Sequence, residues 1–184
     1  PGNNEQRSSL DPDDIEKITG RPYDTYSKVI GGVHFVFWNP GLDTSKSQII
    51  QEKDLKELKA TLDLNKDIPA VVCTHIPLDN NSQFLRPHHF GSKYKYFHYL
   101  NAHEARRVIE DSGNVAFCLA GHKHKNRIKK INDIVYITQD SPVALKKKFD
   151  GPSGSWSFLT FDPDARSLQI DRRGKDAAGI QIDL

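Results

Sequence analysis

Short apolar runs of five or six residues recur along the first two thirds of the chain. They are rich in β-branched and aromatic residues, which is typical of strands, and they cover residues 33–38, 69–74 and 115–119. The second run is apolar over most of its length, as expected for a strand that is covered on both faces. The pattern therefore predicts at least three strands that contribute to a buried sheet.

Amphipathic segments separate these runs. In residues 51–62 the leucines recur at spacings of three and four, which predicts a helix with one buried face. This buried stripe consists of Leu55, Leu58 and Leu62. The sequence Asp-Pro-Asp-Asp at residues 11–14 predicts the start of a short helix that continues to Ile18.

Residues 101–113 carry the signals of a complete helix. Asn101 is a favourable N-cap, Glu104 is placed to close a capping box, and Gly113 suits the C-terminal end. Residues 79–100, between the second strand and this helix, show no periodicity and predict a long polar and aromatic loop.

The last third of the chain has a different pattern. Residues 127–138 predict a β-hairpin around Asn132-Asp133, residues 155–172 predict a second hairpin, and the tail from residue 174 is weakly patterned. Strands that alternate with helices pair in parallel, so the chain is predicted to be an α/β protein with C-terminal β-hairpins. We expect residues 1–184 to form a single domain, because no linker or internal repeat divides them.

Composition narrows the class of protein. Of the 184 residues 36% are hydrophobic and 27% are charged, which is typical of a globular chain, and a net charge of +2 gives no general attraction to nucleic acid or membrane. No apolar run approaches the roughly 20 residues needed for a membrane span. The two cysteines, Cys73 and Cys118, lie in predicted strands, which argues against a disulfide framework and favours a reducing, cytoplasmic setting.

Histidines follow two of the predicted strands. His75 comes directly after the strand at 69–74, and Gly121-His122-Lys123-His124 follows the strand at 115–119. Because the carboxyl ends of parallel strands gather ligand groups, we expect His75 and His122 to meet, and imidazoles in such a cluster suit zinc, iron, nickel or manganese. A single histidine after a strand is more often an ordinary surface or core residue, so the Gly-His-x-His sequence carries more weight than His75.

These histidine sequences resemble the motifs of a known family. Thr74-His75-Ile76-Pro77-Leu78 and Ala120-Gly121-His122-Lys123-His124 are similar to the last two of five metal motifs in calcineurin-like metallophosphoesterases, and Pro1-Gly2-Asn3-Asn4-Glu5 resembles the third, normally Gly-Asn-His-Asp/Glu. The first two motifs, Asp-x-His and Gly-Asp-x-x-Asp, have no counterpart in this chain. The resemblance therefore covers the C-terminal part of the family's catalytic domain, with an N-terminally incomplete domain as the expectation.

The resemblance implies a fold and a set of metal ligands. It implies part of a four-layer α-β-β-α sandwich with mixed sheets, and hydrolysis of phosphate mono- or diesters by two metal ions (Mn, Fe or Zn). By matching motif positions, one metal is assigned Asn3, His75 and His122, and the other is assigned His124. The bridging aspartate is absent from this chain, which leaves open that it binds one metal ion only.

Two further site assignments follow from the same comparison. The family's third-motif histidine assists the leaving group, and Asn4 stands at that position; an amide donates a hydrogen bond but transfers no proton. The loop after His75 supplies candidate substrate-binding residues, and these are Arg86, His88 and His89. A basic run through residues 123–130 is a candidate anion site or, more often for such a run, a solvated face.

Three classes of function remain open at this stage. The first is a metal-dependent phosphoesterase, the second is a catalytically impaired relative that binds a single metal ion or an anionic ligand, and the third is a structural site with one metal ion. A chain without the family's first strands would also leave an apolar sheet edge open. We therefore expect either a missing N-terminal half or a homo-oligomer to cover that edge.

Overall fold

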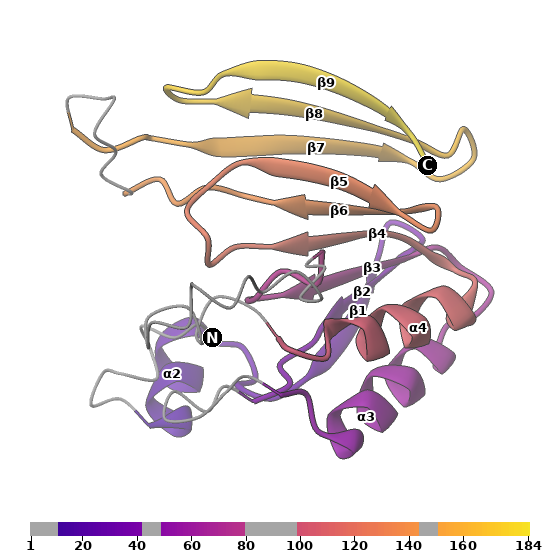
Figure 1. Ribbon diagram of the computed structural model, residues 1–184. Helices are drawn as coiled ribbons and strands as arrows, with labels where there is room; N and C mark the ends of the chain where they lie inside the picture. The colour runs from indigo at the N-terminus through magenta and orange to yellow at the C-terminus, as the bar shows by residue number, and fades with distance from the viewer. Residues whose placement is uncertain (1–10, 42–48, 80–98, 144–150) are drawn as a thin grey trace, which may run out of the picture.

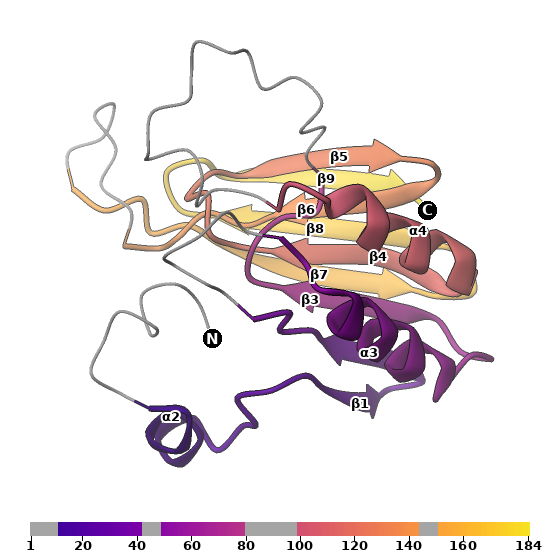
Figure 2. The ribbon, with the colours of Figure 1, turned by 60° about the horizontal axis from the view of Figure 1, so that its bottom comes forward.

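Two β-sheets and two long helices form three layers (Figures 1 and 2). The computed structural model describes residues 11–41, 49–79, 99–143 and 151–184. Within these residues the helices are α2 (Pro12–Thr19), α3 (Glu52–Asp63) and α4 (Ala102–Ser112). None of the helices in these described ranges is long and apolar enough to cross a membrane.

The larger sheet is mixed and contains six strands within the described residues, in the order β1-β2-β3-β4-β6-β5. Its strands are β1 (Tyr26–Ile30), β2 (Val33–Phe37), β3 (Ala70–Thr74), β4 (Val115–Ala120), β5 (Arg127–Ile131) and β6 (Ile134–Thr138). The four inner strands β2, β3, β4 and β6 are parallel, while β1 and β5 pair antiparallel at the two edges. The predicted α/β class and the hairpin at 127–138 are therefore confirmed.

The smaller sheet is antiparallel and has the order β7-β8-β9. Its strands are β7 (Trp156–Asp162), β8 (Ser167–Arg173) and β9 (Ala178–Asp183). In Figure 2 this sheet lies behind β3 to β6, and the helices α3 and α4 lie in front of them. The three layers are thus helix, sheet and sheet, which agrees with part of the predicted four-layer sandwich.

Each face of the large sheet has its own hydrophobic core. On the helix side, the predicted stripes of α3 and α4 are buried against alternate residues of the inner strands; this core includes Leu58, Leu62, Ala105, Ile109, Val36 and Val72. On the other side, residues of the inner strands pack against β8; this core includes Val71, Phe117, Val135, Leu168 and Ile170. Burial on both faces explains why the inner strands are apolar almost throughout.

Helix α4 begins at the predicted residue but is capped differently. Asn101 is the N-cap, yet its side chain makes no capping hydrogen bond to the helix backbone. Its amide instead accepts a hydrogen bond from Ile50 N and donates to Ile50 O (both 2.9 Å), and it donates to Glu104 Oε2 (2.8 Å). The predicted capping box at Asn101 is therefore wrong, because the side chain ties α4 to the start of α3. The end at Gly113, with φ of +74°, is confirmed.

Two strands are absent from the sequence prediction. No element was predicted for the residues of β1, and the segment of β9 reads as a weakly patterned tail. Both lie at the edge of a sheet and have mostly exposed residues, so neither shows the apolar run that marks the inner strands. They form because neighbouring strands offer free backbone groups, and sequence periodicity does not record this.

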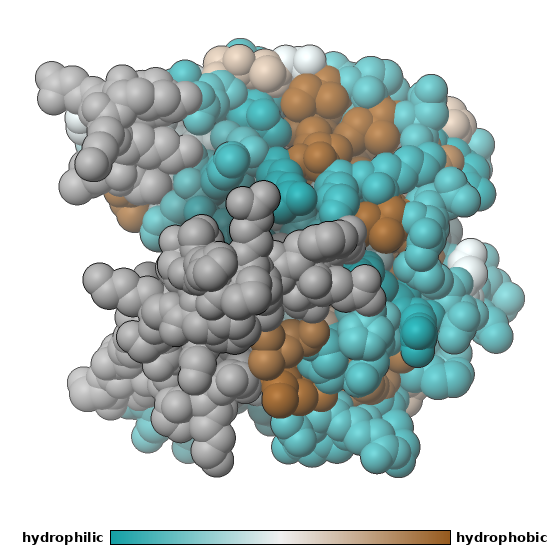
Figure 3. Space-filling model, in the orientation of Figure 1, coloured by the Kyte–Doolittle hydropathy of each residue, from teal (hydrophilic) through white to brown (hydrophobic). Residues whose placement is uncertain are grey.

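Strand β7 leaves apolar side chains in contact with solvent. It is an edge strand within the described residues, and Trp156, Phe158 and Leu159 are 47%, 61% and 37% exposed. The two aromatic rings pack edge to face with centroids 4.9 Å apart. In Figure 2, β1 projects beyond β7, so the smaller sheet does not cover the whole of the larger one. Apolar surface in Figure 3 forms separate patches between polar side chains.

The cysteines lie on opposite faces of the large sheet. Cys118 belongs to the core on the helix side and Cys73 packs against the core between the sheets, and both are free thiols. Burial raises the pKa of the Cys73 thiol to about 12 and raises the pKa of Cys118 as well. The two thiols are therefore separated by the sheet and are not paired in this structure.

His34 is predicted to make the fold sensitive to acid. Its side chain is fully buried in β2, neither ring nitrogen has a hydrogen-bond partner among the described residues, and burial lowers the pKa of the ring below its ordinary 6.5. Below pH 6.5 the His34 ring is therefore protonated more readily in the unfolded chain than in the folded chain. The contribution of His34 to the free energy of unfolding should therefore be constant above pH 6.5. Below pH 6.5 the free energy of unfolding should decrease, by at most about 1.4 kcal/mol per pH unit.

Urea unfolding between pH 8 and pH 5 measures this effect. His34→Leu should remove part of the acid-dependent loss, whereas His103→Leu, at an exposed position of α4, should leave the pH profile unchanged. Equal pH profiles for the native chain and the His34→Leu variant would contradict the assignment.

Candidate metal centre

His75 and His122 come together at one edge of the large sheet. Strands β3 and β4 pair in parallel up to Thr74 and Ala120, so the residues that follow both strands emerge side by side. The Gly121 amide donates to His75 O at 3.1 Å, which continues the pairing by one more step. The expectation that these two histidines meet is confirmed, and we call them the histidine pair.

The rings of the histidine pair are in direct contact. His122 Nδ1 lies 3.0 Å from His75 Nε2, and the ring planes are inclined at 69°. Two nitrogens that are each about 2.0–2.1 Å from one metal ion lie about 2.9–3.4 Å apart at octahedral or tetrahedral angles. The same distance fits a hydrogen bond in which one neutral ring donates to the other. The geometry therefore suits one metal ion or one shared proton between the rings.

A tight turn holds His122 in place. The Lys123 amide donates to Gly121 O at 2.7 Å, which closes a three-residue turn with His122 at its centre and a φ of +66°. Residues other than glycine rarely adopt this backbone conformation, which costs on the order of 1–3 kcal/mol. The chain thus maintains a strained backbone at the residue whose ring contacts His75.

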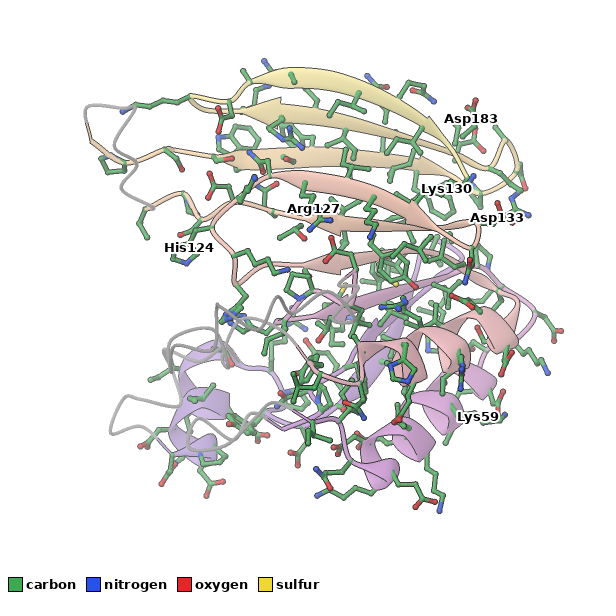
Figure 4. The ribbon with its side chains drawn as sticks, in the orientation of Figure 1. Lys59, His124, Arg127, Lys130, Asp133 and Asp183 are labelled. Atoms are coloured by element: carbon green, nitrogen blue, oxygen red, sulfur yellow. The ribbon has the colours of Figure 1, made fainter. Side chains whose placement is uncertain are left out.

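His124 lies on the turn between β4 and β5, and its side chain is exposed (Figure 4). Its φ of +46° is again in the left-handed region. Among the described residues no three His, Cys, Asp or Glu side chains form a group able to hold a metal ion. The structure thus brings together two of the predicted ligands, and the role of His124 at a second metal ion stays a prediction.

The other predicted site residues lie outside the described ranges. They are Asn3, Asn4, Arg86, His88 and His89. Their assignments as metal ligand, leaving-group residue and substrate-binding residues therefore stay predictions.

A buried carboxylate that the sequence reasoning missed lies on the segment that follows His75. Asp79 is 1% exposed, and its oxygens lie 3.1 Å from Arg127 Nε and 3.8 Å from Lys123 Nζ. Lys129 Nζ also donates to Asp79 O at 3.2 Å, and Arg106 Nη1 donates to Leu78 O at 2.7 Å. Part of the basic run at 123–130 is thus directed at the segment that follows His75, and it ties that segment to the loop of His122.

A hydrogen-bond network fixes the other end of the same loop. Asn126 accepts from the Asp140 amide at 3.0 Å and donates to Ser155 Oγ at 3.1 Å. Gln139 Nε2 also donates to Ser155 Oγ, and Ser157 Oγ donates to Gln139 Oε1. The loop that carries His122 and His124 is therefore anchored to the chain between the two sheets, which limits the freedom of both histidines.

A cavity of about 540 Å³ adjoins His75. It lies where β2 and β3 end, and its outer wall comes from α2 and the segment that follows it. Aromatic rings make up much of the lining: Tyr23, Tyr26, Phe37 and Trp38. Sequence reasoning did not find this cavity, because its walls come from segments whose contact no local pattern predicts.

Structure comparison finds a similar fold where the two sequence comparisons find no match. No family model matches the chain, and no curated protein matches it significantly. A dimetal phosphatase from Danio rerio is 12% identical with a TM-score of 0.59, over 86% of this chain and 60% of the phosphatase chain. The described chain therefore has the fold of a dimetal phosphatase and spans 60% of that protein's length.

Two other solved structures align less well. One is GAP50, described as the anchor in the inner membrane complex of Plasmodium, with 16% identity and a TM-score of 0.46 over 87% of this chain and 52% of its own. The other is a variant of Vps29 from Entamoeba histolytica, with 15% identity and a TM-score of 0.32 over 83% of this chain and 98% of its own. Of these three structures, the phosphatase agrees with the resemblance to calcineurin-like metallophosphoesterases, and it does so at the level of fold.

The Asp79 ion pairs are predicted to stabilise the loop of His122. Arg127→Ala removes the nearer cation from a buried carboxylate, so the free energy of unfolding should fall by about 1–3 kcal/mol. Lys130→Ala is the matched control on the same strand, because Lys130 lies 4.0 Å from an exposed carboxylate, that of Asp133 (Figure 4). It should change stability by less than about 0.5 kcal/mol. Equal losses for the two variants, measured by urea unfolding, would show that Asp79 is not the stabilised group.

Proposed function

We propose that this chain is part of a metal-dependent phosphoesterase that hydrolyses phosphate mono- or diesters at a dinuclear metal centre. The observation that carries the proposal is the 3.0 Å approach of His75 Nε2 and His122 Nδ1 where two parallel strands end. The fold of a dimetal phosphatase supports it. The strained backbone at His122 supports it as well, because strain of this kind concentrates at functional sites.

The residues present fit a metal ion. Imidazole nitrogen is a ligand for Mn, Fe and Zn, and the two rings have the separation of adjacent ligands on one ion. In the proposed site His75, His122 and Asn3 hold one metal ion and His124 contributes to the second. A metal pair at such a site activates water and neutralises phosphate charge. The bridging aspartate and the remaining ligands would come from sequence outside this chain.

In the proposed site, the residues of this chain orient the metal ligands and the phosphate ester. The turn centred on His122 and the Asp79 ion pairs tie together the segments that follow β3 and β4. This supports the proposal that the two rings need little reorganisation when an ion binds. Asn4 is proposed at the leaving group, where its amide donates a hydrogen bond without supplying a proton. Arg86, His88 and His89 remain proposed contacts for the phosphate ester.

The exposed edge at β7 supports the proposal that further chain belongs to the site. Trp156, Phe158 and Leu159 lie on an edge strand, where additional strands would pair and cover them. We propose that an N-terminal half of the domain covers this edge, and that a second copy of the chain is the alternative. With one buried and one half-buried free cysteine, a reducing cytoplasmic location is proposed as well.

A second candidate is a catalytically impaired relative that binds one metal ion or an anion. It is favoured by the exposed side chain of His124 on the turn between β4 and β5 (Figure 4), and by the lack of a three-ligand metal group among the described residues. Metal analysis separates the two candidates. In a version of the chain that carries the first two motifs, two ions per chain together with turnover of p-nitrophenyl phosphate support the first, and one ion without turnover supports the second.

The histidine pair is predicted to be necessary for metal binding. Changes outside the ligand sphere commonly weaken metal affinity roughly 10–100-fold, so His75→Ala and His122→Ala should each weaken zinc affinity by at least that range. His103→Ala, at an exposed position of α4, is the matched control and should bind zinc as the native chain does. Isothermal titration calorimetry with zinc measures all three variants. Unchanged affinity in both pair variants would exclude the metal assignment.

Asn4 is predicted to limit turnover. In a version of the chain that carries the first two motifs, Asn4→His should raise kcat by about 10²–10⁴-fold, because a general acid becomes available to the leaving group. The gain should be smaller for p-nitrophenyl phosphate, whose leaving group needs little protonation, than for an alkyl phosphate. Equal rates on alkyl phosphates with and without the Asn4→His substitution would remove Asn4 from this role.

A further inference from the structure

The cavity beside His75 has the size and lining of a site for an organic ring. Its volume of about 540 Å³ lies within the range of roughly 300–1,000 Å³ that is typical of small-molecule sites. Tyr26 and Phe37 stack in its wall with centroids 4.7 Å apart and planes inclined at 15°. Flat aromatic walls favour a flat aromatic occupant, because such rings bury a large area and stack with defined geometry.

Hydrogen bonds hold the outer wall of the cavity in place. The Tyr23 amide donates to Glu16 Oε1 at 2.6 Å, and Asn39 Nδ2 donates to Tyr23 O at 2.9 Å. The backbone amide of Asn39 donates to Thr25 Oγ1 at 3.1 Å, and Thr25 Oγ1 donates to Glu57 Oε2 at 2.7 Å. The wall is therefore connected to α2, to the end of β2 and to α3. A ligand would find this wall already formed, which lowers the entropy cost of binding.

Polar groups lie at defined places in the same cavity. Arg21, Asp24 and Asn39 are part of its lining and offer donors and acceptors to the edge of a heterocycle. His75 lines the cavity and also contacts His122, so it connects the aromatic walls to the histidine pair. A ligand with an aromatic ring in the cavity would reach the histidine pair with a group attached to that ring.

We propose that this cavity is the ring-binding subsite of the protein and that it takes the nucleobase of a nucleoside phosphate whose phosphate lies at the histidine pair. A nucleobase combines a flat stacking face with a polar edge, whereas a simple alkyl phosphate would leave the aromatic walls without a partner. The placement of the phosphate rests on the proposed function. The placement of the ring rests on the cavity alone.

The two tryptophans of the chain provide a direct test. Trp38 lines the cavity, while Trp156 lies on β7. The Trp156→Phe variant therefore has Trp38 as its only tryptophan, and its fluorescence reports occupancy of the cavity. With EDTA present to prevent turnover, AMP is titrated against ribose 5-phosphate, adenosine and inorganic phosphate. We expect AMP to bind at least tenfold more tightly than ribose 5-phosphate, and adenosine to change Trp38 emission while inorganic phosphate does not.

Substitutions in the wall locate the binding. In the Trp156→Phe background, Tyr23→Ala should weaken AMP binding at least tenfold and leave ribose 5-phosphate unchanged. Tyr26→Leu is a second variant that keeps an apolar side chain beside Phe37 and should reduce AMP binding in the same way. Phe158→Ala is the matched control, because it removes an exposed aromatic ring on β7. It should leave AMP binding unchanged. Urea unfolding of each variant establishes that it is folded.

The outcomes separate this proposal from the proposed function. Equal binding of AMP and ribose 5-phosphate, or equal AMP binding in the folded Tyr23→Ala and Tyr26→Leu variants and in their parent, overturns the ring subsite. If p-nitrophenyl phosphate is nevertheless hydrolysed by the metal-loaded protein, the proposed function stands. If AMP shows the ring preference but no metal binds to the histidine pair, the ring subsite stands and the proposed function fails.

Discussion

The parallel pairing of β3 with β4 is the constraint on which the candidate site depends. Because Thr74 lies opposite Ala120, the next residues of both strands leave the sheet at the same level. A register shift by one residue would turn every side chain of one strand to the other face of the sheet. Both faces are packed, one against the helices and one against the smaller sheet, so such a shift would place residues of one core in the other. The two hydrophobic cores therefore set the register, and the register places the histidine pair.

The strands and helices that were predictable from the sequence are those with a strong burial pattern. Burial in the cores requires apolar side chains, and these give the apolar runs of β2, β3 and β4 and the leucine stripe of α3. Strands β1 and β9 were not predicted, because they lie at sheet edges and most of their residues are exposed. The capping role of Asn101 was misassigned because its side chain bonds to Ile50, 51 residues earlier, and local sequence patterns contain no information about such a partner.

Some features of the candidate site were also predictable from the sequence, and others were not. The contact of His75 with His122 followed from two strand ends that each carry a histidine, together with the rule that parallel strands end together. Asp79 was missed, because a single carboxylate at the start of a polar loop has no local mark of burial. Its partners Lys123 and Arg127 were noticed as members of a basic run, and a charge run alone does not reveal a buried counter-charge. The cavity beside His75 was missed because α2 and the ends of β2 and β3 form it jointly.

The separation of the histidine pair along the chain affects how the protein folds. His75 and His122 are 47 residues apart, and the contact between their strands closes a loop of that length. Loop closure on this scale costs conformational entropy and slows the formation of parallel pairs relative to the local turns of the β5–β6 and β7–β8 hairpins. An ion held by both rings would join the two ends of this loop, as a disulfide does in a secreted protein. It would thereby stabilise the least local part of the fold.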